Sequence, residues 1–335
     1  MAAGTTRKIS AASARAHTRK PKQKASVAGF SGVFKKILLV SFIGFLAWAY
    51  QATRPPSPKT CGSPDGPPVT ASRIKLNDGR HLAYKEYGVS KDKANYKTLF
   101  VHGFDSCRHD VSAITSGLSQ DIVESQGLHI VSFDRPGYGE SDPNPKQTVK
   151  SIAYDIEELA DKLGLGSKFY VVGFSMGGQQ LPQDQWALRV VRHVPWLTHW
   201  WNTQKLFPGL SLIAHSPDVL SNQDRELLPR LLSIRKEYQA QVRQQGDFVS
   251  LHRDLMIGFG TWEFDPTDLE NPLLESAGLI HLWQGDDDKL VPVTLQRYIA
   301  QKLPWIQYHE VPGAGHMFPF ADGMADSIIK TLLVG

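Results

Sequence analysis

The sequence predicts an α/β fold in which a mostly parallel sheet carries helices on both faces and a helical cap. Apolar runs of strand length alternate with longer helical runs before residue 181 and again after residue 270, which is typical of a parallel sheet covered by helices. Residues 181–270 contain helical patterns and aromatic residues without β alternation. We therefore expect a core in two parts, residues 73–180 and 271–335, with the cap inserted at residues 181–270.

Charge divides the chain into a basic N-terminal part and an acidic body. The 335 residues carry a net charge of +4, yet residues 1–64 hold eleven of the 37 Lys and Arg and no acid. The body therefore has 26 basic and 33 acidic side chains. At 41% hydrophobic residues the chain can bury a large core. Two cysteines, Cys61 and Cys107, exclude a disulfide framework and a Cys-rich metal site.

Three segments precede the body. Residues 1–36 are rich in Lys, Arg, Ser and Ala without apolar periodicity, so we expect a disordered tail. Residues 37–52 form an apolar anchor helix, and residues 53–72, which are rich in Gly and Pro, form a linker. Because the basic tail lacks interleaved aromatic residues, we expect no nucleic-acid partner.

The apolar helix allows three interpretations. The uncharged run Ile37–Tyr50 covers about 21 Å of a hydrocarbon layer roughly 30 Å thick, so a span must extend back through residues 27–34 and let Lys35 and Lys36 snorkel. The nine Lys and Arg before residue 37 favour a single-pass membrane anchor with a cytoplasmic N-terminus. A transit segment for a plastid or another organelle, and an apolar helix packed on the body, are the alternatives.

The first part of the core begins with a hairpin. Residues 73–76 and 81–87 flank Asn77-Asp78-Gly79, whose chemistry is typical of a tight turn with positive φ. Strands at 98–101, 128–133 and 169–172 then alternate with helices at 111–125 and 149–163. The second part repeats the pattern, with strands at 279–283 and 307–311 and helices at 294–303 and 320–333.

One motif carries chemistry. Gly173-Phe174-Ser175-Met176-Gly177 follows an apolar strand and precedes a helix start, as in a nucleophile elbow. We expect a Cβ at either glycine to collide with neighbouring backbone, because the turn is sharp. Such a turn lifts the hydroxyl of Ser175 above the sheet edge, where it can act as a nucleophile.

A serine nucleophile needs a histidine base and a carboxylate that orients the histidine. In proteins with this elbow the chain order is serine, acid, histidine. His316 follows a strand and precedes a helix, so a loop can present it at the same edge. Three carboxylates follow the preceding strand; we assign Asp288 as the acid, with Asp286 as the alternative and Asp287 as a solvated turn residue.

The developing oxyanion needs two backbone N–H donors. His102-Gly103-Phe104 ends a strand, so we assign the N–H groups of Phe104 and Met176. The side chain of His102 fits a brace of this loop better than a catalyst. Residues 134–141, with two turn glycines, shape the rim of the same edge.

These motifs resemble the α/β-hydrolase superfamily of the AB hydrolase-1 type, and the basic N-terminal tail resembles a plant membrane-associated branch. The resemblance covers about residues 73–333 and keeps the family's order of motifs: His102–Phe104, residues 134–141, Gly173–Gly177, Gly285–Pro292 and His316. It implies a serine hydrolase of a small carboxylic ester with an apolar group, without cofactor or metal. Ser175 argues against epoxide hydrolases and dehalogenases, which use aspartate there, whereas perhydrolases and carbon–carbon hydrolases stay open.

The sequence departs from the family directly after the elbow. Family members continue with a crossover helix and a strand, but here Pro182 breaks any such helix within two turns. Either residues 183–194 and 210–214 replace these elements, or one helix and one core strand are missing. We favour the missing strand, which predicts a catalytically impaired chain or a non-catalytic binder of a small ligand.

Overall fold

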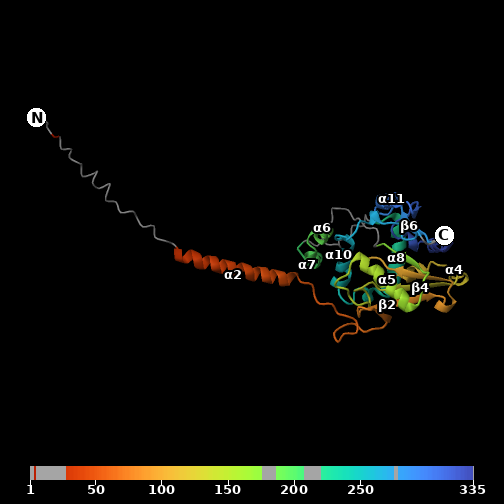
Figure 1. The fold of residues 1–335 in the computed structure, drawn as a ribbon, viewed down its shortest axis with the longest axis horizontal. Coiled ribbons are helices and arrows are strands. Elements are labelled where there is room, and N and C mark those ends of the chain that lie inside the picture. Colours follow the sequence, from red (N-terminus) through yellow and green to blue (C-terminus); the bar gives the residue numbers. More distant parts are fainter. Residues whose placement is uncertain (1–3, 5–27, 176–185, 207–219, 275–277, 335) are drawn as a thin grey trace. The chain divides into compact units, whose positions relative to one another are not determined.

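The computed structural model describes residues 4, 28–175, 186–206, 220–274 and 278–334, in two units, Met1–Ala52 and Thr53–Gly335 (Figure 1). Helix α2 (Ala28–Thr53) begins at Ala28 rather than at residue 37, so the end of the tail predicted to be disordered is helical. Within it, Gly32–Thr53 has a mean hydropathy of 1.7. These 22 residues reach about 33 Å, enough for a membrane span by length and composition, although a signal sequence passes the same test.

The second unit contains two sheets. The larger one has the strand order β1-β2-β4-β3-β5, with β3 parallel to β4 and β5 and with β2 antiparallel to β1 and β4. The smaller one pairs β6 with β7 in parallel. The strands are β1 (Ser72–Lys75), β2 (His81–Gly88), β3 (Tyr96–Val101), β4 (Leu128–Phe133), β5 (Tyr170–Gly173), β6 (Ile280–Gly285) and β7 (Ile306–Val311).

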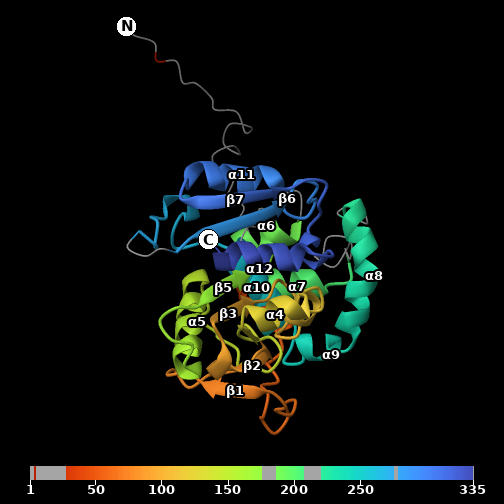
Figure 2. The ribbon, with the colours of Figure 1, turned by 90° about the vertical axis from the view of Figure 1, so that its right-hand side faces the viewer.

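Helices cover both faces of the larger sheet, which confirms the predicted layering (Figure 2). Helix α5 (Val149–Leu163) covers one face, where Leu159 shares an apolar cluster with Leu99 and Val131. The predicted bounds of α5 are correct. On the other face Ile329 of the C-terminal helix shares a cluster with Ile130. The helices of that face are α3 (Val111–Thr115), α4 (Gln120–Ser125) and α12 (Met324–Val334), and α11 (Val293–Lys302) contacts the smaller sheet.

The single helix predicted over residues 111–125 is wrong, since α3 ends at Thr115 and α4 begins at Gln120. Ser116 Oγ donates to the carbonyl oxygen of Ala113 at 2.8 Å, a local bond that competes with helix continuation. Ser119 is extended, and its N–H donates to Asp326 of α12 at 3.0 Å. The predicted closing helix also starts late, at Met324, because Gly323 has a φ of +74°.

Within the described part of residues 181–270, the regular elements are helices and helical turns, without a strand; the bounds of the insertion stay a prediction. Near its end, the backbone of Val249 lies so close to the rim that a Cβ added to Gly137, whose φ is +85°, would stand 1.9 Å from the Val249 carbonyl oxygen. The insertion thus packs on the rim loop at residues 134–141. Its elements are α6 (Trp186–His193), α7 (Thr198–Thr203), α8 (Asn222–Lys236), α9 (Gln239–Val242), the π-helical turn η5 (Phe248–His252), α10 (Arg253–Phe259) and the 3₁₀ turns η2 (Pro195–Leu197) and η6 (Pro266–Asp268).

The predicted linker is tied to the body at its C-terminal end. Glu140 accepts hydrogen bonds from the N–H of Thr70 at 2.7 Å and from that of Ala71 at 2.9 Å. Further back, the N–H of Cys61 donates to the side chain of Gln245 at 3.1 Å. The segment that enters β1 is therefore held by the rim loop and the insertion.

Among the described residues, no strand pairs with the outer edge of β5 or with the free edge of β6. Val171 on β5 is 48% exposed, and Leu279, just before β6, is 46% exposed. Both are apolar residues in a region that a continuous sheet would bury. The proposed replacement strand at residues 210–214 lies outside the described residues, so the missing strand stays a prediction.

Candidate active site

Ser175 stands directly after β5 and is one of two described non-glycine residues with positive φ, at +65°. This left-handed conformation is costly for serine and is typical of a functional turn. It aims the hydroxyl at the loop after β7, where Ser175 Oγ lies 2.8 Å from His316 Nε2. Phe174 supports this pair, because its ring lies 5.5 Å from the His316 ring.

The other ring nitrogen of His316 meets the predicted acid. His316 Nδ1 lies 2.8 Å from Asp288 Oδ2, and both side chains are largely buried. Nδ1 therefore carries the proton that it donates to the carboxylate, which leaves Nε2 free to accept the proton of Ser175. The three residues come from the ends of three strands and form one chain of hydrogen bonds.

Asp288 is held as a carboxylate by donors around it. Burial by itself raises the pKa of Asp288, but hydrogen bonds from His316, the Val291 N–H and the Gln284 amide outweigh burial and lower it overall. The N–H of Leu290 donates to the same carboxylate at 2.8 Å. An ionised and oriented Asp288 is what a histidine base requires.

The two neighbouring aspartates, Asp286 and Asp287, make different contacts. Asp286 Oδ1 accepts from the N–H of Gly313 at 2.6 Å, so Asp286 closes the turn after β7. Asp287 is exposed, and its N–H donates to the carbonyl oxygen of Ala314. Of the three carboxylates predicted as candidates, Asp288 is the one that His316 contacts.

The strand end that holds Phe104 lies beside Ser175. A Cβ added to Gly103 would stand 3.1 Å from Ser175 Cβ, so the backbone passes close to the serine. The Phe104 side chain packs against a cluster of Leu188, Val191 and Leu255 from the insertion. The second predicted donor, Met176, lies outside the described residues.

The expected crowding at the elbow is wrong for Gly173. Among the described residues, nothing lies within 4 Å of a Cβ added there. The physical reason is the open edge of β5, since no described strand lies beside it to supply the backbone that a Cβ would hit. The other elbow glycine, Gly177, lies outside the described residues.

Comparison with known proteins decides the family. The sequence model that describes the alpha/beta hydrolase family matches residues 98–327 of this chain. The chain belongs to the alpha/beta hydrolase family. Solved structures share the fold over 79% of this chain. They include an esterase from Thermogutta terrifontis (21% identity, 99% of that chain, TM-score 0.54), an alpha/beta hydrolase fold protein from Chitinophaga pinensis (20%, 97%, 0.53) and an enol-lactonase from Burkholderia xenovorans LB400 (14%, 100%, 0.54). The predicted α/β-hydrolase fold is confirmed.

In this family member His102 is buried and fixed as a neutral ring. Its Nε2 accepts a hydrogen bond from the backbone N–H of Arg135 at 3.0 Å, and its Nδ1 donates one to the Gly103 carbonyl oxygen at 2.8 Å. Burial and the Arg135 guanidinium lower the pKa of His102 well below its ordinary value. His102 therefore braces the loop before Phe104.

Arg135 and Asp254 are site-supporting residues that the sequence did not reveal. The Arg135 guanidinium donates to the carbonyl oxygens of His102 at 3.0 Å and Gly103 at 2.8 Å. It also makes two bonds, of 2.5 and 2.6 Å, to Asp254 in α10. One buried guanidinium thus joins the Phe104 loop to the insertion. The rim motif contains Arg135, but nothing local in the sequence pairs it with Asp254.

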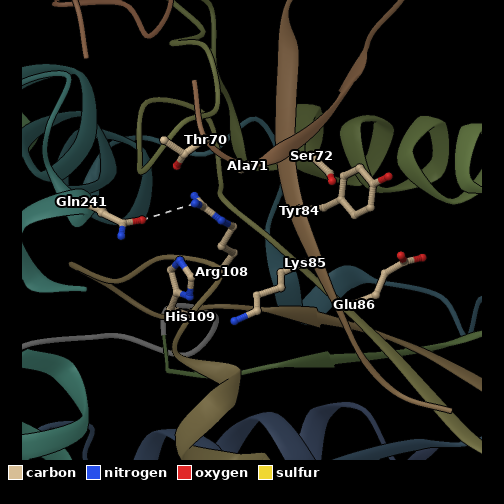
Figure 3. A pocket seen from close by; sticks show the side chains of 9 residues that line it. All are labelled: Thr70, Ala71, Ser72, Tyr84, Lys85, Glu86, Arg108, His109 and Gln241. Atoms are coloured by element: carbon tan, nitrogen blue, oxygen red, sulfur yellow. Dashed lines mark hydrogen bonds between the residues drawn. The ribbon is translucent and has the colours of Figure 1, made fainter. Parts of the chain in front are cut away.

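A cavity of about 400 Å³ lies elsewhere in the hydrolase (Figure 3). Its lining includes Lys85 and His109, together with Arg108, whose guanidinium donates to Gln241. None of Ser175, Asp288 and His316 lines it. This cavity is therefore separate from the candidate catalytic residues.

Proposed function

We propose that the chain is a serine hydrolase that acts on a carboxylic ester bearing an apolar group. The observation that carries the proposal is the continuous hydrogen-bond chain from Ser175 Oγ through His316 to Asp288, with both links at 2.8 Å. Two of the structures that share the fold are an esterase and an enol-lactonase. The apolar cluster behind Phe104 favours an apolar substrate group.

The reaction follows from the proton positions. His316 Nε2 takes the proton of Ser175 as Oγ attacks the ester carbonyl carbon, while Asp288 stabilises the imidazolium. The N–H groups of Phe104 and Met176 are the proposed donors to the oxyanion. Collapse of the tetrahedral intermediate breaks the ester C–O bond, and His316 protonates the leaving alcohol.

Water completes the cycle. It attacks the acyl carbon while His316 Nε2 accepts its proton, and collapse of the second tetrahedral intermediate returns that proton to Ser175 Oγ. The acid leaves and the free serine is restored. This sequence needs only the ester, water and the protein's own side chains.

A fluorophosphonate probe and a short-chain nitrophenyl ester test the proposal. We expect the probe to label the wild-type chain and not Ser175→Ala. Asp288→Asn should lose about 10³- to 10⁴-fold in turnover, because the histidine loses its orienting carboxylate. Asp286→Asn is the matched control, since Asp286 does not contact His316, and it should keep its activity. Equal labelling of wild type and Ser175→Ala would reject the assignment.

A second candidate is a catalytically impaired chain or a non-catalytic binder of a small apolar ligand. The edges of β5 and β6 that no described strand pairs with favour it, because among the described residues no ladder joins the strand that carries Ser175 to those that carry its partners. A folded chain that resists the probe, yet gains melting temperature with apolar ligands, would support this reading. Labelling restored by inserting a family helix and strand after Gly178 would identify the missing elements as the cause.

We also infer that α2 anchors the chain in a membrane as a single span with a cytoplasmic N-terminus. The length and hydropathy of Gly32–Thr53 and the nine preceding Lys and Arg support this orientation. A transit segment for a plastid or another organelle is the alternative. Membrane pellets that retain the protein after alkaline extraction would favour the anchor, whereas a mature N-terminus beyond residue 53 would favour transit.

A further inference from the structure

The first turn of α8 holds the loop that carries His316. Asp224 Oδ2 accepts from the N–H of His316 at 3.1 Å, and Asp224 Oδ1 accepts from the N–H of Met317 at 2.7 Å. The N–H of the preceding residue, Gly315, donates to the Gln223 side chain at 2.9 Å. Three consecutive N–H groups around the candidate base are therefore bound by one helix of the insertion.

The fit between this helix and the loop is close. A Cβ added to Gly315 would stand 2.0 Å from Ser221 Oγ and 2.3 Å from Asp224 Oδ2. Further along the same loop, Arg230 of α8 donates to the carbonyl oxygen of Phe320. Helix α8 thus forms hydrogen bonds with both ends of the loop from Gly315 to Phe320.

Asp224 is an unusual residue for a capping role alone. Its side chain is fully buried, and no Lys, Arg or His forms an ion pair with it among the residues that the structure describes. The carboxylate is satisfied by backbone N–H groups, including that of Ser221 at 3.1 Å. Burying a charge in this way costs free energy, and a buried serine or threonine could cap the helix without that cost.

Helix α5 provides the comparison within the same chain. It also starts with a capping box, in which Ser151 and Thr148 exchange hydrogen bonds of 3.0 and 3.1 Å. Among the described residues, the hydrogen bonds of the Ser151 side chain all go to Thr148, including one to the Thr148 carbonyl oxygen. The same local motif is therefore purely structural in α5 and is extended to the His316 loop in α8.

We propose that Asp224 is a positioning residue, which sets the place of His316 relative to Ser175 by holding the N–H groups of His316 and Met317. The proposal rests on the proposed serine-hydrolase function. It makes the helical insertion part of the catalytic apparatus, because α8 would fix the base from outside the sheet. A small displacement of a catalytic group can cost about 100-fold in rate.

Asp224→Asn tests the proposal with little change of shape. If the amide nitrogen takes the place of Oδ2, it faces the N–H of His316; if it takes the place of Oδ1, it faces that of Met317. Either orientation loses one bond to the loop. We expect kcat on the nitrophenyl ester and the rate of fluorophosphonate labelling to fall about 10- to 100-fold, with KM changed less than about threefold.

Ser151→Ala is the matched control, because it breaks the capping box of α5 without touching the site. It should lower the melting temperature and leave labelling unchanged at a temperature where both variants are folded. Hydrogen exchange of the amides at residues 315–317 gives a readout that needs no activity, and we expect faster exchange only in Asp224→Asn.

The outcomes separate the two proposals. Labelling at the wild-type rate by folded Asp224→Asn, whether or not its melting temperature falls, overturns the positioning role. Unchanged exchange at residues 315–317 overturns it as well. If the folded wild type is not labelled, the proposed function fails, and with it the catalytic meaning of Asp224, while the exchange experiment still decides whether Asp224 holds the loop.

Discussion

The buried pair of Arg135 and Asp254 leads to a quantitative prediction about stability. Both side chains are 3% exposed, and Asp254 receives two hydrogen bonds from the guanidinium and one of 2.8 Å from the Tyr138 hydroxyl. Asp254→Ala leaves the Arg135 charge buried without its counter-ion. Removing one partner of such a pair costs about 3–5 kcal/mol, and the Tyr138 hydroxyl proton, which loses its acceptor, adds about 1 kcal/mol.

We therefore expect Asp254→Ala to lower the free energy of unfolding by about 4–6 kcal/mol. The double variant Arg135→Ala/Asp254→Ala should lose less than the sum of the two single variants, because the second substitution removes the uncompensated charge. Urea denaturation followed by Trp fluorescence measures these losses. The bidentate pair of Arg297 with Glu310 is the surface control, since Arg297 is 49% exposed and its replacement by Ala should have a much smaller effect.

A loss below about 1 kcal/mol for Asp254→Ala would refute the reasoning, since it would mean that water or another group replaces the carboxylate at no cost. Additive losses in the double variant would refute it too. Fluorophosphonate labelling of the folded fraction adds a second readout. Arg135 also holds the carbonyl oxygens of His102 and Gly103, so Arg135→Ala should slow labelling more than Asp254→Ala does.

Two further predictions concern pH and backbone space. Burial lowers the pKa of His252 to about 4. The unfolded chain, with an ordinary value near 6.5, then binds a proton that the folded chain does not, so unfolding should become easier by about 1.4 kcal/mol per pH unit from pH 6.5 towards 4. His252→Gln should remove that part of the slope in urea melts, and an unchanged slope would contradict it. Gly137→Ala, which drives a Cβ to 1.9 Å from the Val249 carbonyl oxygen, should cost more than about 3 kcal/mol. Gly79 also has a positive φ, but no described atom lies within 4 Å of a Cβ added there, so Gly79→Ala should cost only about 1 kcal/mol. Equal losses in the two variants would show that the backbone at Val249 moves aside at little cost.

Local signals account for the parts of the fold that the sequence predicted well. Helix α5 has the predicted bounds because Thr148 caps its start and Gly164, at φ +64°, ends it. Ser175, Asp288 and His316 could be chosen because each follows a strand, and the ends of parallel strands meet at one edge of a sheet. The catalytic roles of the three residues stay proposals.

Tertiary contacts account for what the sequence missed. Asp254 lies 119 residues from Arg135, and Asp224 lies 92 residues from His316. No periodicity or spacing links partners that meet only when the insertion folds back on the core. The break at residues 116–119 depends in the same way on the bond from Ser119 to Asp326. Sequence patterns thus brought out the candidate reacting groups and missed the contacts that hold them.

The contacts that hold the site matter more here than in a continuous sheet. In such a sheet, ladder hydrogen bonds fix the spacing between the strand of the serine and those of its partners, but β5 and β6 share no ladder among the described residues. The remaining links are side-chain packing and loop bonds. Phe174 contacts the rings of both His316 and Phe320, while α8 binds the same loop through Asp224. Because the described residues provide few such links, the distance from Ser175 to His316 should be the first property of the site to fail when the insertion loosens, before the fold itself is lost.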